Sequence, residues 1–197
     1  MKLIAHRGIH KTKEEQNTLG AFINAINNDE YVGFECDVRQ TKDKKFIINH
    51  DAFIENKLIK FTNLKDLKIK KILKLTDVLK LNTKKNMLIE IKYLNIDINK
   101  FNKILKRYKN KNIYVMSFHN SILNKLYYKP HNYKLGLLDY VLNKEENYKY
   151  DFVCLLNNLT SKDKVKLYLK NNKEVFIYGM LGKKEFKYGD KCYYIFD

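Results

Sequence analysis

Residues 33–39 read Gly33-Phe34-Glu35-Cys36-Asp37-Val38-Arg39, a largely apolar stretch that two acids interrupt. Its length and its apolar residues predict a β-strand. Side chains at positions i and i+2 of a strand point to the same face, so Glu35 and Asp37 are expected to project together. Two carboxylates this close repel each other unless a cation lies between them or one is protonated. Hard divalent ions such as Mg²⁺ and Ca²⁺ take oxygen ligands of this kind.

A second predicted strand repeats this pattern. Met87–Lys92 places Glu90 and Lys92 on one face of a stretch that is otherwise apolar. The pair His50-Asp51 closes another apolar run, Lys45–Asn49, which we predict as the return arm of a hairpin. Acids and a histidine thus recur in or just after strands.

Strand-like and helix-like stretches alternate along the whole chain, which predicts an α/β protein. Besides the hairpin arm, eight strands are expected, over Leu3–Ala5, Gly33–Arg39, Met87–Lys92, Ile113–Phe118, Lys134–Leu138, Phe152–Leu156, Glu174–Tyr178 and Cys192–Phe196. Helices are expected over Thr18–Asn28, Thr76–Leu81, Ile98–Tyr108, Ser121–Tyr127 and Lys162–Asn171. Several strand runs are continuously apolar, as in sheets covered on both faces.

Eight strands alternating with helices predict a (β/α)₈ TIM barrel, with an open α/β sheet as the alternative. The 197 residues allow about 25 for each of eight units, well below the roughly 250-residue norm. We therefore expect a compact barrel in which some outer helices are short or missing. One Pro and seven Gly leave few natural boundaries, so residues 1–197 are expected to form a single domain.

The composition sets limits on the partners. Three cysteines without a CxxC pair exclude a disulfide framework and a zinc finger and favour a reducing, cytoplasmic location. No signal peptide or membrane span is expected. The net charge is +17, but only three of the 39 basic residues are Arg, the residue that specific nucleic-acid readers prefer. Most of the lysines are scattered, and we interpret them chiefly as a compositional bias of a solvated surface.

Two histidines, one arginine, three acids and a lysine lie in or at the ends of predicted strands. His6 and Arg7 follow directly on the first strand. Each signal alone is weak, because a histidine at a strand end or an exposed pair of acids is common. A barrel, however, gathers the carboxyl ends of its strands at one mouth, where its active sites lie. Together these residues therefore predict a catalytic site.

The same residues occur in motifs that resemble those of the glycerophosphodiester phosphodiesterases. The order and spacing match strongly over residues 3–92 and more loosely beyond. The motifs are Ile4-Ala5-His6-Arg7-Gly8, Gln16-Asn17-Thr18-Leu19-Gly20-Ala21-Phe22, Phe34-Glu35-Cys36-Asp37-Val38, Thr41-Lys42-Asp43, Asn49-His50-Asp51, Ile89-Glu90-Ile91-Lys92 and Met116-Ser117-Phe118. Tyr178 stands where the family usually has a tryptophan, and Gly189-Asp190 precedes a run similar to the family's closing strand.

The resemblance implies a TIM barrel of the phospholipase-C-like phosphodiesterase type and a role for each residue. Glu35, Asp37 and Glu90 would hold one divalent cation, Mg²⁺ or Ca²⁺. His6 and His50 would be the general acid and base. The phosphate would be bound by Arg7 with help from Lys92, and the aromatic wall would be formed by Tyr178.

Two departures from the family pattern affect the expectations. Gln16 stands where the family usually has a glutamate, which puts the metal affinity or the site geometry in question. The family's insertion corresponds here to only about 25 residues, 51–76. We expect this segment to form a short cap over an open pocket.

The expected function is metal-dependent hydrolysis of a small glycerophosphodiester to glycerol-3-phosphate and an alcohol. One alternative is cleavage of a lysophospholipid, with the positive charge holding the enzyme peripherally on an anionic membrane. The other is a catalytically reduced barrel that binds nucleic acid or another polyanion, against which the complete set of catalytic residues argues. The head group, the metal and the oligomeric state are left open by the sequence.

Overall fold

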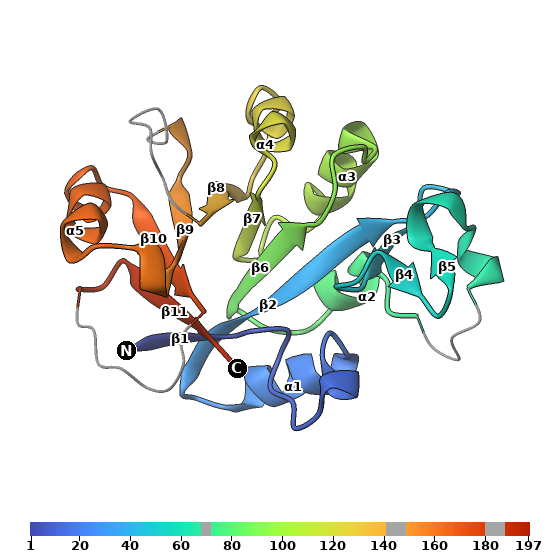
Figure 1. Ribbon diagram of the computed structural model, residues 1–197, viewed down its shortest axis with the longest axis horizontal. Helices are drawn as coiled ribbons and strands as arrows, with labels where there is room; N and C mark the ends of the chain where they lie inside the picture. The colour runs from blue at the N-terminus through green and yellow to red at the C-terminus, as the bar shows by residue number, and fades with distance from the viewer. Residues whose placement is uncertain (68–71, 141–148, 180–187) are drawn as a thin grey trace.

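The computed structural model describes residues 1–67, 72–140, 149–179 and 188–197, and these form a closed barrel (Figure 1). Eight parallel strands follow one another around the ring in chain order, and β1 pairs with both β2 and the last strand, β11, which closes it. The strands are β1 (Lys2–Ala5), β2 (Tyr31–Gln40), β6 (Asn86–Ile91), β7 (Ile113–Ser117), β8 (Lys134–Asp139), β9 (Phe152–Leu156), β10 (Glu174–Tyr178) and β11 (Cys192–Phe196). The predicted TIM barrel is confirmed, and the open sheet is excluded.

Five α-helices of the described residues cover the outside of the barrel (Figure 1). They are α1 (Leu19–Asn27), α2 (Leu75–Leu79), α3 (Ile98–Leu105), α4 (Asn120–Tyr127) and α5 (Lys162–Lys170), each within a few residues of its predicted bounds. At five residues, α2 is short, as the compact length requires. The connections that follow β8 and β10 lie largely outside the described residues, so the expectation of missing helices is not tested there. None of the helices in the described ranges has the length and apolar character needed to span a bilayer.

Alternation along the strands separates two layers of buried side chains. In β2, Phe34, Cys36 and Val38 belong to the layer between the sheet and the helices. In β6, Leu88 instead belongs to the layer that fills the barrel interior. Glu35 and Asp37, between the outward residues of β2, therefore face the interior, as their two-residue spacing predicts.

The amino-terminal end of the barrel is closed by a polar cluster around Glu174. The carboxylate accepts hydrogen bonds from Tyr114 (3.2 Å), Tyr193 (3.1 Å) and Lys134 (2.6 Å). These residues stand at the first or second position of β7, β8, β10 and β11. The opposite end, where the strands finish, is the end that carries the candidate site.

The predicted hairpin arm and cap lie beside the end of β2. Strand β3 (Phe46–Ile48) pairs antiparallel with β2, as expected. The described part of residues 51–76 contains the two-stranded sheet β4 (Phe53–Ile54) and β5 (Lys57–Leu58). Within the described residues, the 3-10 helices η2 (Ile59–Phe61) and η3 (Leu64–Asp66) belong to the cap. Outside it, η1 (Lys13–Glu15) precedes α1 and η5 (Asn157–Leu159) follows β9. A small apolar cluster packs the cap residues Ile54, Ile59 and Leu67 against Ile47 of β3.

Candidate active site

A cavity of about 270 Å³ lies where the strands end, at the mouth of the barrel. Seven of the eight residues singled out in the sequence line it: His6, Arg7, Glu35, His50, Glu90, Lys92 and Tyr178. The eighth, Asp37, is buried and forms ion pairs with Arg7 and Lys92. The structure thus brings together residues that are up to 172 positions apart in the chain.

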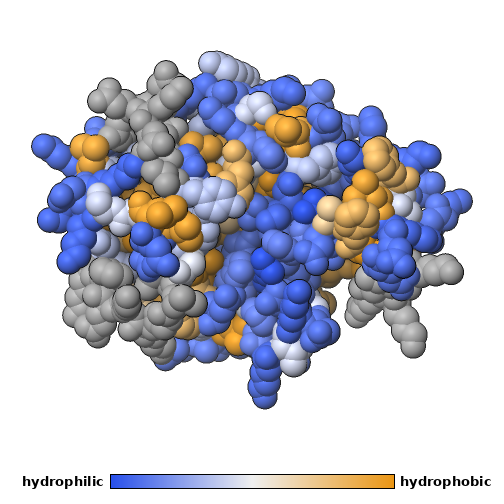
Figure 2. All heavy atoms as spheres, viewed as in Figure 1, coloured by the Kyte–Doolittle hydropathy of each residue, from blue (hydrophilic) through white to orange (hydrophobic). Residues whose placement is uncertain are grey.

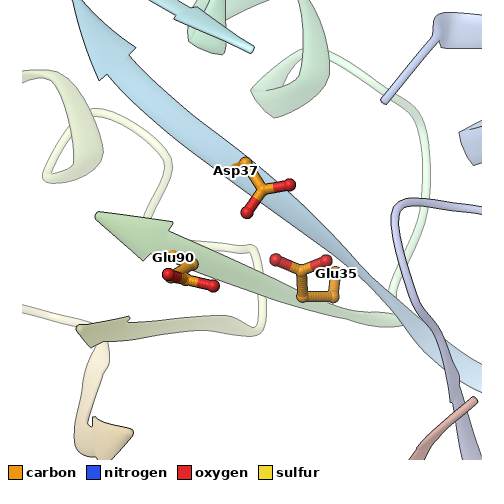
Figure 3. Close-up of side chains that lie close together, drawn as sticks. All are labelled: Glu35, Asp37 and Glu90. Atoms are coloured by element: carbon orange, nitrogen blue, oxygen red, sulfur yellow. The ribbon is translucent and has the colours of Figure 1, made fainter. Parts of the chain in front are cut away.

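The three acids form a buried cluster on neighbouring strands. Glu35 and Asp37 project from β2 and Glu90 from β6, with the carboxylates turned toward one another (Figure 3). One oxygen from each lies within 4.8 Å of the others. Burial, together with the charges of Asp37 and Glu90, raises the pKa of Glu35 well above its usual range. The pKa of Glu90 is raised in the same direction, chiefly by burial.

This arrangement fits a divalent cation. Among the described residues, the buried Oε1 of Glu35 has no hydrogen-bond partner, while Oε2 accepts from the backbone N–H of Arg7 at 3.1 Å. An unpaired buried carboxylate oxygen costs free energy, and a hard cation satisfies it while removing the repulsion among the three acids. Glu35, Asp37 and Glu90 would therefore hold the ion.

Arg7 lies between the cluster and the solvent in a turn that constrains its backbone. Its φ is +54°, and the next residue, Gly8, has φ +82° with Ala21 packed so closely that a side chain at Gly8 would collide with it. The guanidinium donates from Nη1 to Gln16 Oε1 at 2.7 Å, and Nε lies 3.2 Å from Asp37 Oδ2. The guanidinium is therefore held in place at the cavity wall.

Gln16 does not extend the acidic cluster. Its amide carbonyl accepts from Arg7, and its amide nitrogen lies 3.0 Å from His10 Nε2. The other ring nitrogen of His10 lies 2.9 Å from the carbonyl of Gly8. These contacts link Gly8, His10, Gln16 and Arg7 in one chain. Gln16 thus orients Arg7 through a chain of hydrogen bonds.

Asn17 is a residue of the site whose role was not predicted from the sequence. Its side-chain nitrogen donates to Asp37 Oδ2 at 2.7 Å, and its oxygen accepts from the backbone N–H of Asp37 at 3.2 Å. Asn17 adopts φ +58°, which asparagine tolerates better than most residues. The sequence feature that could have indicated this role is the position of Asn17 in the Gln16-Asn17-Thr18 motif, directly before the N-cap of α1.

Lys92 offsets part of the negative charge of the three acids. Its Nζ lies 2.9 Å from Glu90 Oε1 and 3.4 Å from Asp37 Oδ1. Burial alone would lower the pKa of Lys92, but the charges of Asp37 and Glu90 outweigh it, so the pKa is raised. The lysine therefore stays charged at the edge of the cluster.

Each of the two histidines directs one ring nitrogen toward a carboxylate. His6 Nδ1 contacts Asp197 Oδ1, and His50 Nδ1 lies 2.8 Å from Asp51 Oδ1. A carboxylate at Nδ1 fixes the ring orientation and presents Nε2 as the atom for proton transfer. Burial lowers the pKa of His50, more than the hydrogen bond to Asp51 raises it. Asp197 lies 191 positions from His6, and no sequence pattern linked the two.

Aromatic side chains form one wall of the cavity. Phe118 stacks on Tyr140 with ring centroids 4.8 Å apart and meets Tyr178 edge-on at 6.5 Å. The hydroxyl of Tyr178 donates to the carbonyl of Asp139 at 3.3 Å. Tyr178 therefore contributes an apolar ring rather than a free hydroxyl. Phe118 and Tyr140 extend this wall beyond the one aromatic residue that was singled out.

Solved structures match the barrel fold of this chain. A glycerophosphodiester phosphodiesterase from Parabacteroides distasonis is 20% identical, with a TM-score of 0.79, and the match covers 92% of this chain and 84% of that one. The corresponding protein from Thermotoga maritima is 23% identical, with a TM-score of 0.74 and coverage of 91% and 86%. An Oleispira antarctica phosphodiesterase, in complex with the product sn-glycerol-3-phosphate, is 16% identical, with a TM-score of 0.76 and coverage of 91% and 85%. At this identity the likeness establishes the fold.

The sequence itself establishes the family. No curated protein matches the chain. The sequence model of the glycerophosphoryl diester phosphodiesterase family, however, matches residues 6–190, which include all eight of the residues singled out above. The chain therefore belongs to the glycerophosphoryl diester phosphodiesterase family of enzymes.

Proposed function

We propose that this enzyme hydrolyses a small glycerophosphodiester, such as glycerophosphocholine or glycerophosphoethanolamine, to glycerol-3-phosphate and an alcohol. The observation that carries the proposal is one cavity in which three buried carboxylates lie beside Arg7, Lys92 and two histidines. The complex of the Oleispira antarctica phosphodiesterase with sn-glycerol-3-phosphate supports the choice of product. One Mg²⁺ or Ca²⁺ is the proposed cofactor.

The chemistry needs charge neutralisation and two proton transfers. A phosphodiester is a stable anion, and we assign the binding of its oxygens to Arg7, which lines the cavity. A divalent cation, when bound at the acids, supplies further positive charge next to the phosphate. The aromatic wall of Phe118, Tyr140 and Tyr178 excludes water from one side of the cavity.

We assign the proton transfers to the histidines. In the first step the substrate's neighbouring hydroxyl forms a bond to phosphorus and the bond to the alcohol oxygen breaks, which leaves a cyclic phosphate. His50, whose pKa is lowered, accepts the hydroxyl proton, and His6 donates a proton to the leaving oxygen. Water then opens the cyclic phosphate with these proton transfers reversed. No side-chain nucleophile is required.

The test is release of glycerol-3-phosphate from a panel of glycerophosphodiesters. Activity should disappear in EDTA and return with excess Mg²⁺ or Ca²⁺. His6→Ala and His50→Ala should each lower kcat by about 10²–10⁴-fold while leaving the circular dichroism spectrum and Tm unchanged. His131→Ala, which changes a histidine outside the cavity lining, is the matched control. Equal activity with and without EDTA, or none on any substrate of the panel, contradicts the proposal.

A second candidate substrate, a lysophospholipid presented by a membrane, is favoured by exposed apolar side chains. Phe53 and Phe61 of the cap are 55% and 67% exposed, and Leu94, Tyr140 and Leu159 are exposed in segments that follow other barrel strands. Hydrophobic surface lies beside a hydrophilic centre, most clearly over the β4–β5 segment (Figure 2). Apolar side chains around a mouth, on a protein of net charge +17, suit an anionic bilayer.

Co-sedimentation with phosphatidylglycerol vesicles at low salt separates the two substrates. Binding by the wild type that a Phe53→Ser/Phe61→Ser variant loses, together with hydrolysis of lysophospholipid in vesicles, supports the membrane substrate. Ile23→Ser, on the outer face of α1, is the control because it removes an exposed apolar side chain elsewhere. No vesicle binding at low salt removes this candidate and leaves the soluble diester.

A further inference from the structure

A second cavity, of about 480 Å³, lies on the flank of the barrel and shares no lining residue with the active-site cavity. It is formed by the turn between β2 and β3, the start of β3, the start of α2 and the outer face of α3, which lie together at the right of Figure 1. We call it the flank cavity. Its lining residues are Lys44, Lys45, Phe46, Lys74, Leu75, Thr76, Lys100, Lys103, Ile104 and Arg107.

The lining of the flank cavity is far more basic than the chain as a whole. Six of its ten residues are Lys or Arg, against 39 of 197 in the sequence, and none of the ten is acidic. A compositional bias toward lysine raises basic residues everywhere on the surface and does not by itself gather them around one hollow. The concentration of charge is therefore a local feature.

Arg107 strengthens this argument. The chain has 36 Lys and three Arg, so a bias toward lysine does not account for the arginines. Arg7 lines the active site, and Arg39 donates two hydrogen bonds, of 2.9 and 2.6 Å, to the carbonyl of His50. The third arginine lines the flank cavity. Arginine binds phosphate through a planar pair of donors, which lysine cannot reproduce.

Few of these cations have an acidic partner. Lys44 Nζ lies 3.4 Å from Asp97, and Lys100 donates to the carbonyl of Lys44 at 2.7 Å. Within the described ranges, Lys45, Lys74, Lys103 and Arg107 form no ion pair. Asp43 is the acid whose charge interacts with Lys45. Four cations without an ion pair around one hollow produce a positive potential that a multiply charged anion would relieve.

We propose that the flank cavity binds an organic phosphate that carries at least two phosphate groups, of the nucleoside di- or triphosphate kind. A single phosphate would leave most of the cations uncompensated. The lining also includes the apolar residues Phe46, Leu75 and Ile104, of which the half-buried Ile104 offers contact to the carbon-bearing part of such a ligand. This site is separate from the proposed hydrolysis and does not depend on it.

The test is isothermal titration of the protein with ATP and with inorganic tripolyphosphate at about 0.15 M salt. Lys103→Gln/Arg107→Gln, the α3 variant, removes one exposed cation from α3, where glutamine is a good helix former, and one exposed cation just after its C-cap Lys106. Lys166→Gln/Lys170→Gln removes the same charge from exposed positions of α5, outside the flank cavity, and is the matched control. We expect saturable 1:1 binding of ATP, at least tenfold weaker in the α3 variant and within twofold of wild type in the α5 variant.

Three further measurements make the result specific. Arg7→Ala should keep the ATP affinity, which separates the flank cavity from the active site. Tripolyphosphate, which has no carbon-bearing part to contact Ile104, should bind more weakly than ATP. Vesicles that carry a phosphatidylinositol bisphosphate headgroup are titrated in parallel. The ligand is the free molecule if the α3 variant loses affinity for ATP, and the lipid if it loses affinity for the vesicles instead.

The proposal is overturned by any of three results. The first is an equal loss of ATP affinity in the α3 and α5 variants, which shows non-specific attraction to a basic surface. The second is loss of ATP binding in Arg7→Ala, which places the nucleotide in the active site. The third is an absence of saturable binding of either phosphate probe or of the vesicles, including the case in which only RNA binds.

Discussion

Glu35 is the residue at which stability and function conflict most directly. It is 1% exposed, lies beside two other acids, and has a pKa raised well above its usual range by burial and by those charges. Because the pKa is higher in the folded than in the unfolded state, the folded state binds more protons. Its carboxyl therefore favours the folded state least at high pH, and stability falls as the pH rises through the folded pKa.

Replacing Glu35 by Gln should therefore stabilise the metal-free protein. Near neutral pH in EDTA we expect Glu35→Gln to raise the free energy of unfolding by about 1–2 kcal/mol, which is several degrees in Tm. Excess Mg²⁺ or Ca²⁺ should raise the Tm of the wild type and leave that of the variant unchanged. Thermal unfolding followed by circular dichroism measures both. A variant less stable than wild type in EDTA would contradict this account of the cluster.

His50 is expected to set the acidic side of the pH profile. A base must be unprotonated, and burial keeps the pKa of His50 below its ordinary value of about 6.5. The plot of kcat/KM against pH should therefore fall on the acidic side with a midpoint below about 6.5.

A matched variant sharpens this test of His50. The hydrogen bond that His50 donates to Asp51 raises the pKa of His50, so Asp51→Asn should move the acidic midpoint to still lower pH. A midpoint above about 6.5, or a shift to higher pH in Asp51→Asn, contradicts the assignment of His50 as the base.

Gln16 is expected to act as a positioning residue through Arg7. Removing the 2.7 Å hydrogen bond in Gln16→Ala should raise KM for the diester by roughly tenfold, as expected for a hydrogen bond to a charged group, with a smaller effect on kcat. Gln16→Glu retains an acceptor for the guanidinium and should keep KM within about threefold. Steady-state kinetics of both variants measures KM and kcat for this comparison. Equal KM values in wild type and Gln16→Ala would show that Arg7 is held without Gln16.

At the residue scale, the sequence predicted the parts of the site that lie on strands. Glu35 and Asp37 follow from a two-residue period, and Glu90 repeats the pattern. Asp197 and Tyr140 could not be predicted in the same way, because their contacts with His6 and Phe118 depend on how the ring closes and not on local spacing.

At the scale of elements, the strands were predicted well because their apolar runs are long. The two-residue strands β4 and β5 were not predicted, since Phe53–Ile54 and Lys57–Leu58 are too short to show a period. The extra length of β2, which runs from Tyr31 to Gln40, reflects its pairing with β1, β3 and β6. Sheet neighbours of this kind are set by tertiary structure.

Substituting alanine at two glycines should change the free energy of unfolding in opposite directions, one through packing in the barrel and the other through helix propensity. A Cβ at Gly136 of β8 would lie 2.3 Å from the ring of Phe152, so Gly136→Ala should cost about 3 kcal/mol. A Cβ at Gly20 of α1 would meet nothing closer than 4.0 Å, so Gly20→Ala should gain about 0.5 kcal/mol. Urea denaturation of the two variants measures both values. Equal stability of Gly136→Ala and wild type would contradict the packing of β8 against β9.

At the scale of the whole molecule, the two ends of the barrel differ: one end is closed by a polar cluster, and the other carries the candidate active site. The Glu174 cluster closes the amino-terminal end, and the acidic cluster with Arg7 and Lys92 occupies the other. Alternation of strands and helices predicted the barrel, and its compactness followed from the length. The sequence could not reveal where the charge gathers, because the six cations of the flank cavity come from segments between Lys44 and Arg107 that only the fold brings together.

The central claim is that one divalent cation at Glu35, Asp37 and Glu90 enables hydrolysis at this mouth. The most direct measurement titrates the metal-stripped enzyme with Mg²⁺ or Ca²⁺ while following both bound metal and release of glycerol-3-phosphate. The account predicts activity that rises from zero and saturates with one cation per chain, and neither binding nor activity in Glu90→Gln. Full activity of the stripped enzyme, or undiminished cation binding by Glu90→Gln, would contradict it.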